Sequence, residues 1–223
     1  MGARSYTRRQ LMAERYVGKA PDGYEWCDYI ENTSNAYIDT GCYPDSDTEV
    51  EITIENKNNS AYKGMVGVDR TGNYRYGIDI HASSSTDARF YYGNGLITIG
   101  TLPLNTKLDI SIRGKKITVN GTSRTISATW TGGALSKPMY LFRMHTGATT
   151  CALMKLHGQT TIKTGGVLRR DYRPIKRLSD NKYGLWDNVS KAFFTSPNGT
   201  NFGGGKSLIL SNLCRCIGER RAA

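Results

Sequence analysis

The sequence predicts an all-β protein, an antiparallel β-sandwich, and three observations support that prediction. Segments in which apolar and polar residues alternate recur at intervals of about 8 to 12 residues, with Gly, Asn and Asp between them. The 223 residues include 25 Gly and 14 Tyr, a composition that favours strands and turns over helices. The pair Asn120-Gly121 separates two such segments and predicts a type I′ hairpin turn, because both residues tolerate positive φ.

Alternation locates the strands in chain order. In the segment 47–55, Val50, Ile52 and Ile54 share one face while polar residues occupy the other, as in an antiparallel strand with one face in water. The segment 139–144 is apolar on both faces, which predicts a central strand. Further strands are predicted at 74–80, 107–113, 117–119, 123–128 and 151–157.

Residues 1–23 are predicted to be a basic N-terminal arm that contains a short helix. Thr7 followed by Gln10 is the pattern of a helix capping box, and a short apolar stripe follows it. A helix of this length is marginal in water on its own, so it needs a partner surface. A Pro-Asp-Gly turn signal ends the arm; the sandwich is expected to span 24–205, and a basic, partly apolar tail to occupy 206–223.

The net charge of +11 is concentrated in three segments. Residues 1–20 hold five basic residues against one acidic residue, residues 163–177 six against one, and residues 206–223 four against one. The rest of the chain is therefore nearly neutral. This distribution favours anchoring surfaces, and basic residues do not alternate with aromatic ones as in a single-strand channel, so we expect no nucleic-acid partner.

Cysteine usage and hydropathy give no sign of a metal or a membrane. No stretch approaches the roughly 18 to 20 apolar residues of a membrane span, and the N-terminus lacks the apolar core of a signal peptide. An odd number of cysteines fits a reducing place of synthesis, with Cys27, Cys42 and Cys151 as small buried residues. Cys214 and Cys216 supply half of a four-ligand zinc site. We expect no metal, no cofactor and no membrane partner.

Two segments more than a hundred residues apart carry a family resemblance. The first, YIENTSNAYIDTG at 29–41, is similar to the entry segment of concanavalin A-like (laminin-G-like) jelly-roll domains, common in phage virion proteins and gut-bacterial surface proteins. The second, at 168–205, resembles the exit of the same domains through LRRDYRP, GLWDNVSKAFF and PNGTNFGGG. The resemblance implies a concanavalin A-like jelly roll that these segments open and close. We interpret the three glycines at 203–205, which end this segment, as a flexible exit.

The sharpest candidate for catalysis is the run from Glu51 to Glu55. Laminarinase-type glucanases of the resembled superfamily carry Glu-x-Asp-x-Glu on a strand, where alternate side chains share one face and two carboxylates flank a glycosidic bond. Here Thr53 takes the middle position, and Glu49 extends the alternation as solvent-facing charge. We therefore interpret the run as a solvated strand face and expect no enzymatic activity. Three histidines lie outside any nucleophile motif: His81, His145 and His157.

Carbohydrate contact is a second interpretation, because the resemblance is to a lectin-like superfamily and aromatic rings stack on sugars. Tyr91, Tyr92 and Trp130 are the aromatic residues expected to be exposed, although packing in the core is the competing interpretation for Trp130. Trp26 and Trp186 lie in the opening and closing motifs and are expected in the core.

The resemblance and the charged termini together predict a non-enzymatic phage virion protein: a capsid decoration, head-fibre or tail-associated protein. It would be made in the host cytoplasm, located in the virion and bound to capsid or tail proteins and to further copies of itself. The first alternative is a glycan-binding, lectin-like module of a phage or bacterial surface protein, which would contact a host-surface glycan. The second is a degenerate glycoside hydrolase. The residues expected to anchor the sandwich are Arg4, Arg8, Arg9, Leu11, Met12, Arg15, Tyr16, Val17, Leu208, Ile209, Leu210, Arg220 and Arg221.

Overall fold

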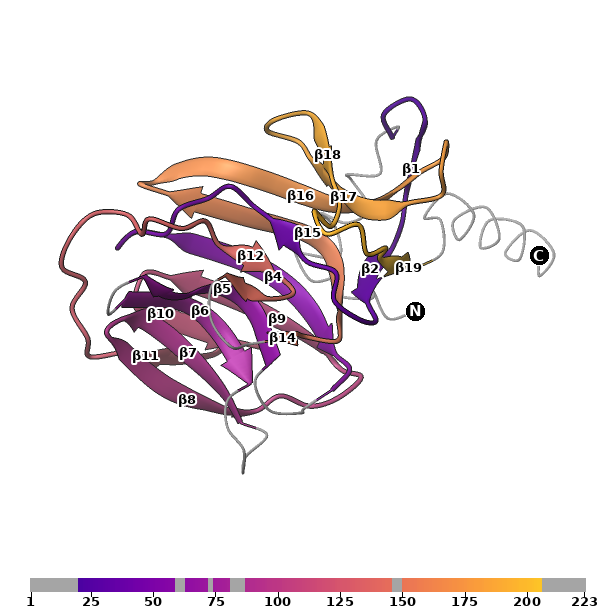
Figure 1. Cartoon of the computed structure of the whole chain (residues 1–223). Coiled ribbons are helices and arrows are strands. Elements are labelled where there is room, and N and C mark those ends of the chain that lie inside the picture. The colour runs from indigo at the N-terminus through magenta and orange to yellow at the C-terminus, as the bar shows by residue number, and fades with distance from the viewer. Residues whose placement is uncertain (1–19, 59–62, 72–73, 81–86, 146–149, 206–223) are drawn as a thin grey trace, which may run out of the picture.

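The computed structural model describes residues 20–58, 63–71, 74–80, 87–145 and 150–205 (Figure 1). Every regular element in these ranges is a strand, and the strands form two mainly antiparallel sheets that pack as a sandwich, which confirms the all-β class. The predicted N-terminal helix and both terminal segments lie outside the described residues. Over the same ranges, no helix is long and apolar enough to cross a membrane.

The larger sheet has 11 strands among the described residues. They are β1 (Tyr24–Trp26), β2 (Tyr29–Asn32), β4 (Glu49–Asn56), β9 (Lys107–Arg113), β10 (Lys116–Val119), β11 (Thr122–Thr125), β15 (Met154–Thr164), β16 (Val167–Arg177), β17 (Tyr183–Asp187), β18 (Ala192–Phe194) and β19 (Gly203–Gly204). The main path across it runs β11-β10-β9-β4-β15-β16-β17-β18. The long strands β15 and β16 form its centre and also pair with the short strands β2 and β1.

The smaller sheet has eight strands in the same part of the chain. They are β3 (Ile38–Asp39), β5 (Lys63–Thr71), β6 (Tyr74–Ile80), β7 (Asp87–Gly93), β8 (Gly95–Thr101), β12 (Tyr140–Leu141), β13 (Met144–His145) and β14 (Thr150–Cys151). Its path runs β3-β12-β5-β6-β7-β8, and β13 and β14 pair with β5 in parallel.

The core lies between the two sheets and follows the predicted alternation. In β4 the inward residues Val50, Ile52 and Ile54 are buried, and every second residue between them is partly exposed. Tyr76 and Ile78 of β6 close the core from the smaller sheet. Burial of each such side chain contributes on the order of 1.5 to 3 kcal/mol, so this interface dominates the stability of the fold.

The hairpin predicted from Asn120-Gly121 is present. Val119 pairs with Thr122 across a two-residue loop, and the φ angles are 46° at Asn120 and 86° at Gly121, as a type I′ turn requires. The turn therefore sets the register of β10 and β11 from local sequence alone.

The predicted central strand at 139–144 is interrupted. Tyr140–Leu141 and Met144–His145 are separate short strands, because Phe142 between them has a φ of 69°, which a continuous strand does not permit. Met139, Leu141 and Phe142 are all buried, so the apolar pattern correctly indicated burial while the predicted continuity was wrong.

The expectation of a flexible glycine exit is also wrong. Gly203–Gly204 is strand β19, which pairs with Glu31 and Ile30 of β2. A side chain at Gly204 would collide with the ring of Tyr183, and one at Gly205 would meet the ring of Tyr29. The glycines are therefore needed for close packing of the closing segment on the opening segment, rather than for mobility.

The described chain enters and leaves at one end of the sandwich. At the entry, Tyr24 pairs with Arg177 of β16; at the exit, Gly205 donates its amide to the carbonyl of Tyr29, which pairs with His157 of β15. The β15–β16 hairpin turn, at residues 164–167, lies at the opposite end (Figure 1). Seven residues from His157 to Thr164 and ten from Val167 to Arg177 separate the two ends, which is about 23 to 33 Å of extended strand.

Candidate functional site

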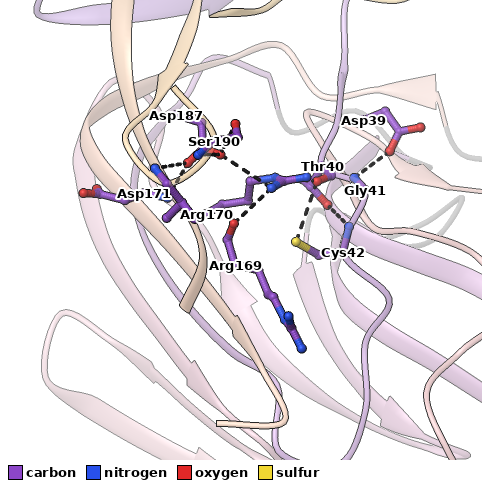
Figure 2. A network of polar contacts seen from close by, with 10 residues as sticks. Asp39, Thr40, Gly41, Cys42, Arg169, Arg170, Asp171, Asp187 and Ser190 are labelled. Carbon is purple, nitrogen blue, oxygen red and sulfur yellow. Dashed lines mark hydrogen bonds and ion pairs between the residues drawn. The ribbon is translucent and has the colours of Figure 1, made fainter. Parts of the chain in front are cut away.

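A buried carboxylate forms the centre of one polar cluster, here called the Asp187 network (Figure 2). The Asp187 side chain has no exposed surface. It accepts the backbone amides of Asp171, Val189 and Ser190 at 2.9, 3.1 and 3.1 Å and the Ser190 hydroxyl at 2.6 Å. Arg170 Nη1 lies 3.5 Å from the second carboxylate oxygen. Burial alone would raise the pKa of Asp187, but these hydrogen bonds outweigh it and hold the pKa below its ordinary value.

Arg170 connects this carboxylate to the opening segment of the chain. Its guanidinium lies 5.3 Å from the centre of the Phe194 ring. Its Nε donates to the Thr40 carbonyl at 2.8 Å (Figure 2). Cys42 lies beside this contact, with its amide donating to the Thr40 hydroxyl at 3.1 Å. The network thus joins residues of the two segments that carry the family resemblance. Because Asp187 is fully enclosed, its role is to hold the fold together.

A solvent-open cleft of about 720 Å³ lies at the β15–β16 hairpin end of the sandwich. It lies between the loop before β4, the β9–β10 turn, the segment at 128–130 and the β15–β16 turn. Its lining residues are Ser46, Asp47, Glu49, Tyr92, Arg113, Gly114, Lys115, Ala128, Thr129, Trp130, Gly165 and Gly166. We call it the Trp130 cleft.

Two of the three aromatic residues predicted to touch a glycan meet at this cleft. The ring centres of Trp130 and Tyr92 are 5.2 Å apart, and the indole Nε1 of Trp130 donates to the Gly133 carbonyl at 3.1 Å, which fixes the ring. Trp130 is half-buried and packs against the core, as the competing interpretation expected, and its contact with a glycan stays a prediction. Tyr91 lies on the other face of β7, where the Arg75 guanidinium is 5.1 Å from its ring centre.

The expectation that Tyr91 and Tyr92 are exposed is wrong, since their exposed fractions are 1% and 6%. They lie on β7, an interior strand that is paired on both sides by β6 and β8. Tyr92 contributes an edge to the Trp130 cleft, with its hydroxyl donating to the Ser46 carbonyl at 3.3 Å. The ring face of Tyr91 is unavailable for stacking on a sugar.

Charged side chains form the polar wall of the Trp130 cleft. Glu49 pairs with Lys163 at 3.0 Å, and Arg113 pairs with Glu51 at 3.0 Å. Asp47 and Lys115 add one carboxylate and one ammonium group. These residues come from β4, β9, β15 and the adjoining loops and share no motif, so the sequence offered no signal that would group them with Trp130.

The outward face of β4 keeps the predicted alternation but is less solvated than expected. Glu55 is only 13% exposed, because Lys57, Lys155 and His157 lie 2.9, 3.7 and 3.2 Å from its carboxylate oxygens. We call these four residues the Glu55 cluster. The hydrogen bond from Lys57 lowers the pKa of Glu55. A lowered pKa is the opposite of what a general acid requires.

Of the three histidines, His157 is the one with a described environment. It is buried between Glu55 and the Tyr29 ring, whose centre is 5.3 Å away, and burial lowers its pKa to about 4. His81 and all the predicted anchoring residues, which belong to 1–19 and 206–223, lie outside the described residues. Cys27, Cys42 and Cys151 are buried free thiols, as predicted. Within the described part of the chain, no group of three His, Cys, Asp or Glu side chains could hold a metal ion.

Comparisons with known proteins give no match: neither a protein-family model nor a curated protein sequence matches the chain.

Proposed function

We propose that the protein is a non-enzymatic structural subunit of a phage virion, a capsid decoration, head-fibre or tail-associated protein held to the particle by its two terminal segments. The observation that carries this proposal is the polarity of the sandwich. Both described chain ends lie at one end, near Arg177 and Tyr29, and the Trp130 cleft lies at the other. A subunit attached through basic termini would present the cleft end outward.

The Asp187 network supports the assignment of the sandwich to the concanavalin A-like jelly rolls. Arg170 and Asp187 belong to the closing segment, Thr40 belongs to the opening segment, and the resemblance is concentrated in these two segments. The pairing of β19 with β2 brings the same segments together through their backbones. The residues that carry the resemblance are thus the residues that close the fold.

The charges on β4 support a role without catalysis. Glu51 is paired with Arg113, and Glu55 is paired with two lysines and His157. A glycosidase needs one carboxyl group that stays protonated until it donates to the leaving oxygen, which requires a raised pKa. The lowered pKa of Glu55 does not suit that task.

Particle incorporation tests this proposal. Antibody against the sandwich should label purified particles in electron microscopy. Leu11→Asp combined with Met12→Asp should release the protein from them, because burial of the apolar arm would provide most of the attachment energy. Arg8→Ala with Arg9→Ala should mainly make attachment more sensitive to salt. A protein absent from particles, or one still attached after loss of both terminal segments, would contradict the proposal.

A glycan-binding module is the second candidate, and the Trp130 cleft is the observation that favours it. An aromatic wall beside carboxylate, ammonium and guanidinium groups is the composition that binds sugar rings and hydroxyls. A glycan array with the full chain tests this candidate. A selective signal that Trp130→Ala abolishes and Trp186→Ala preserves would place binding at the cleft. A signal equal in both variants would exclude the cleft.

A further inference from the structure

Three side chains with complementary chemistry converge at the end of β4 that is remote from the Trp130 cleft. Lys57 Nζ donates to Asn105 Oδ1 at 2.6 Å and to Glu55 Oε1 at 2.9 Å. The main chains on both sides are held as well. The Lys57 amide donates to the Leu153 carbonyl at 2.9 Å, and the Asn105 amide donates to the Asn56 carbonyl at 2.9 Å. An amine, a carboxamide and a carboxyl group are therefore fixed within contact of one another.

The surroundings of this triad shield the amine and the carboxyl group but leave the carboxamide open. The side chains of Lys57 and Glu55 are 27% and 13% exposed, and His157, at 8%, borders Glu55 on its other side. Asn105 is exposed in the connection between β8 and β9, where its φ of 55° holds a turn. A group released from the Asn105 side chain would pass directly into solvent.

We propose that Lys57 and Asn105 form an intramolecular isopeptide bond, with Glu55 as the proton carrier. Glu55 takes a proton from Lys57 Nζ, and the free amine attacks Cγ of Asn105. The new Cγ–Nζ bond forms, Glu55 returns the first proton to Nδ2, and the Cγ–Nδ2 bond breaks to release ammonia. Glu55 then takes the second proton from Nζ and passes it to the ammonia, which leaves as ammonium, so the product is a neutral amide and Glu55 is again a carboxylate. No oxidant, reductant or added cofactor is consumed. The inference is independent of the proposed virion function.

The resting charges determine the rate of this reaction. The mutual hydrogen bond raises the pKa of Lys57 and lowers that of Glu55, so both groups start ionised. Proton transfer from Lys57 to Glu55 is therefore the uphill first step. Bond formation should be slow at neutral pH and faster at alkaline pH, where more of the amine is free. The product would tie β4 of the larger sheet to the connection from β8 of the smaller sheet.

Mass spectrometry of the purified full chain tests the proposal. The intact protein should lose the mass of one ammonia during incubation at alkaline pH. Proteolysis should then yield one branched peptide that contains both Lys57 and Asn105. The branch is the decisive readout, because succinimide formation at Asn120-Gly121 also releases ammonia but leaves a linear peptide.

Matched variants assign the three roles. Lys57→Arg keeps the ion pair with Glu55 but removes the amine, Glu55→Gln removes the proton carrier, and Asn105→Ala removes the carboxamide. Each should lack the branched peptide. Lys163→Arg, which alters the comparable Lys163–Glu49 pair at the other end of β4, should retain it. A wild-type chain without the branched peptide after prolonged alkaline incubation overturns the proposal, as does a branched peptide in the Glu55→Gln variant at the wild-type rate.

Discussion

The carboxylates of Asp187 and Glu55 are both shielded from water, but they are neutralised in different ways. Asp187 receives three backbone amides, a hydroxyl and a guanidinium, all positioned by the fold. Glu55 receives two ammonium groups and an imidazole, carried by Lys57, which follows β4, and by Lys155 and His157 of β15. Side chains can turn towards water when a partner is lost, whereas the amides that bind Asp187, from Asp171 in β16 and from Val189 and Ser190 in the turn after β17, are held in place by the backbone. The loss of Asp187 should therefore cost far more stability than the loss of a carboxylate on β4.

Asp187→Asn should have the largest effect and lower the free energy of unfolding by about 3 to 5 kcal/mol, because it leaves the Arg170 charge and the backbone amides without their anion. Urea denaturation followed by circular dichroism measures this as a lower midpoint at an unchanged slope. A loss below about 1 kcal/mol would mean that the Asp187 network does not hold the opening and closing segments together.

Acid should destabilise the protein in two steps. The first comes from His157, which lies beside Glu55, and the second from Asp187. The pKa of His157 is about 4 when folded, below its ordinary value of about 6.5, so the unfolded state binds the extra proton between these pH values. Stability should fall by about 3 kcal/mol as the pH drops through that window. Asp187 has a folded pKa below its ordinary range, so its contribution is lost only at still lower pH.

His157→Gln isolates the first of these steps. The variant should show a flat stability between pH 6.5 and 4 and the same loss as wild type below that range. Thermal melting across pH provides the measurement. If the variant retained the full decline above pH 4, another group would be responsible for it.

Arg170→Lys should lower the free energy of unfolding by about 1 to 3 kcal/mol. Lysine keeps the positive charge but cannot donate to the Thr40 and Arg169 carbonyls and lie beside Asp187 with one planar group, as the guanidinium does. Unfolding in urea compares the variant with Arg169→Lys, whose side chain is exposed. Equal midpoints for the two variants would count against the linking role of Arg170.

Glu51→Gln should have the smallest effect, about 0 to 1 kcal/mol, because its ion pair with Arg113 is exposed and screened by salt. The same denaturation series checks it, once at low and once at high salt, where the difference from wild type should shrink. A loss comparable to that of Asp187→Asn would remove the contrast between the two carboxylate environments.

Several elements were predictable because their cause is local. The alternation of Val50, Ile52 and Ile54 with polar residues predicts that one face of β4 is buried and the other faces solvent. Asn120-Gly121 specifies a turn whose positive φ angles few other residue pairs tolerate. The predicted strand at 139–144 was less accurate, because apolar residues on both faces indicate burial but do not reveal the positive φ of Phe142.

The candidate sites were predictable only in part. Trp130 and Tyr92 could be singled out as aromatic residues, but their proximity to Asp47 and Lys115 depends on loops from different parts of the chain. The burial of Tyr91 was missed because strand order, which places β7 between β6 and β8, is not written in the local pattern. Likewise, the sequence predicted that Glu55 is solvated, because it does not show that β15 pairs with β4 and brings Lys155 and His157 next to Glu55.

By itself, the sequence determined the all-β class, the main strands, the type I′ hairpin and the two segments that resemble the ends of one domain, because residue periodicity and turn chemistry act over a few neighbouring positions. Only the tertiary structure decided that these segments meet in the Asp187 network, that the ends of the described chain lie opposite the Trp130 cleft, and that Lys57 touches Asn105. Those contacts join residues far apart in the chain, and they form only when sheet order and register bring the strands together.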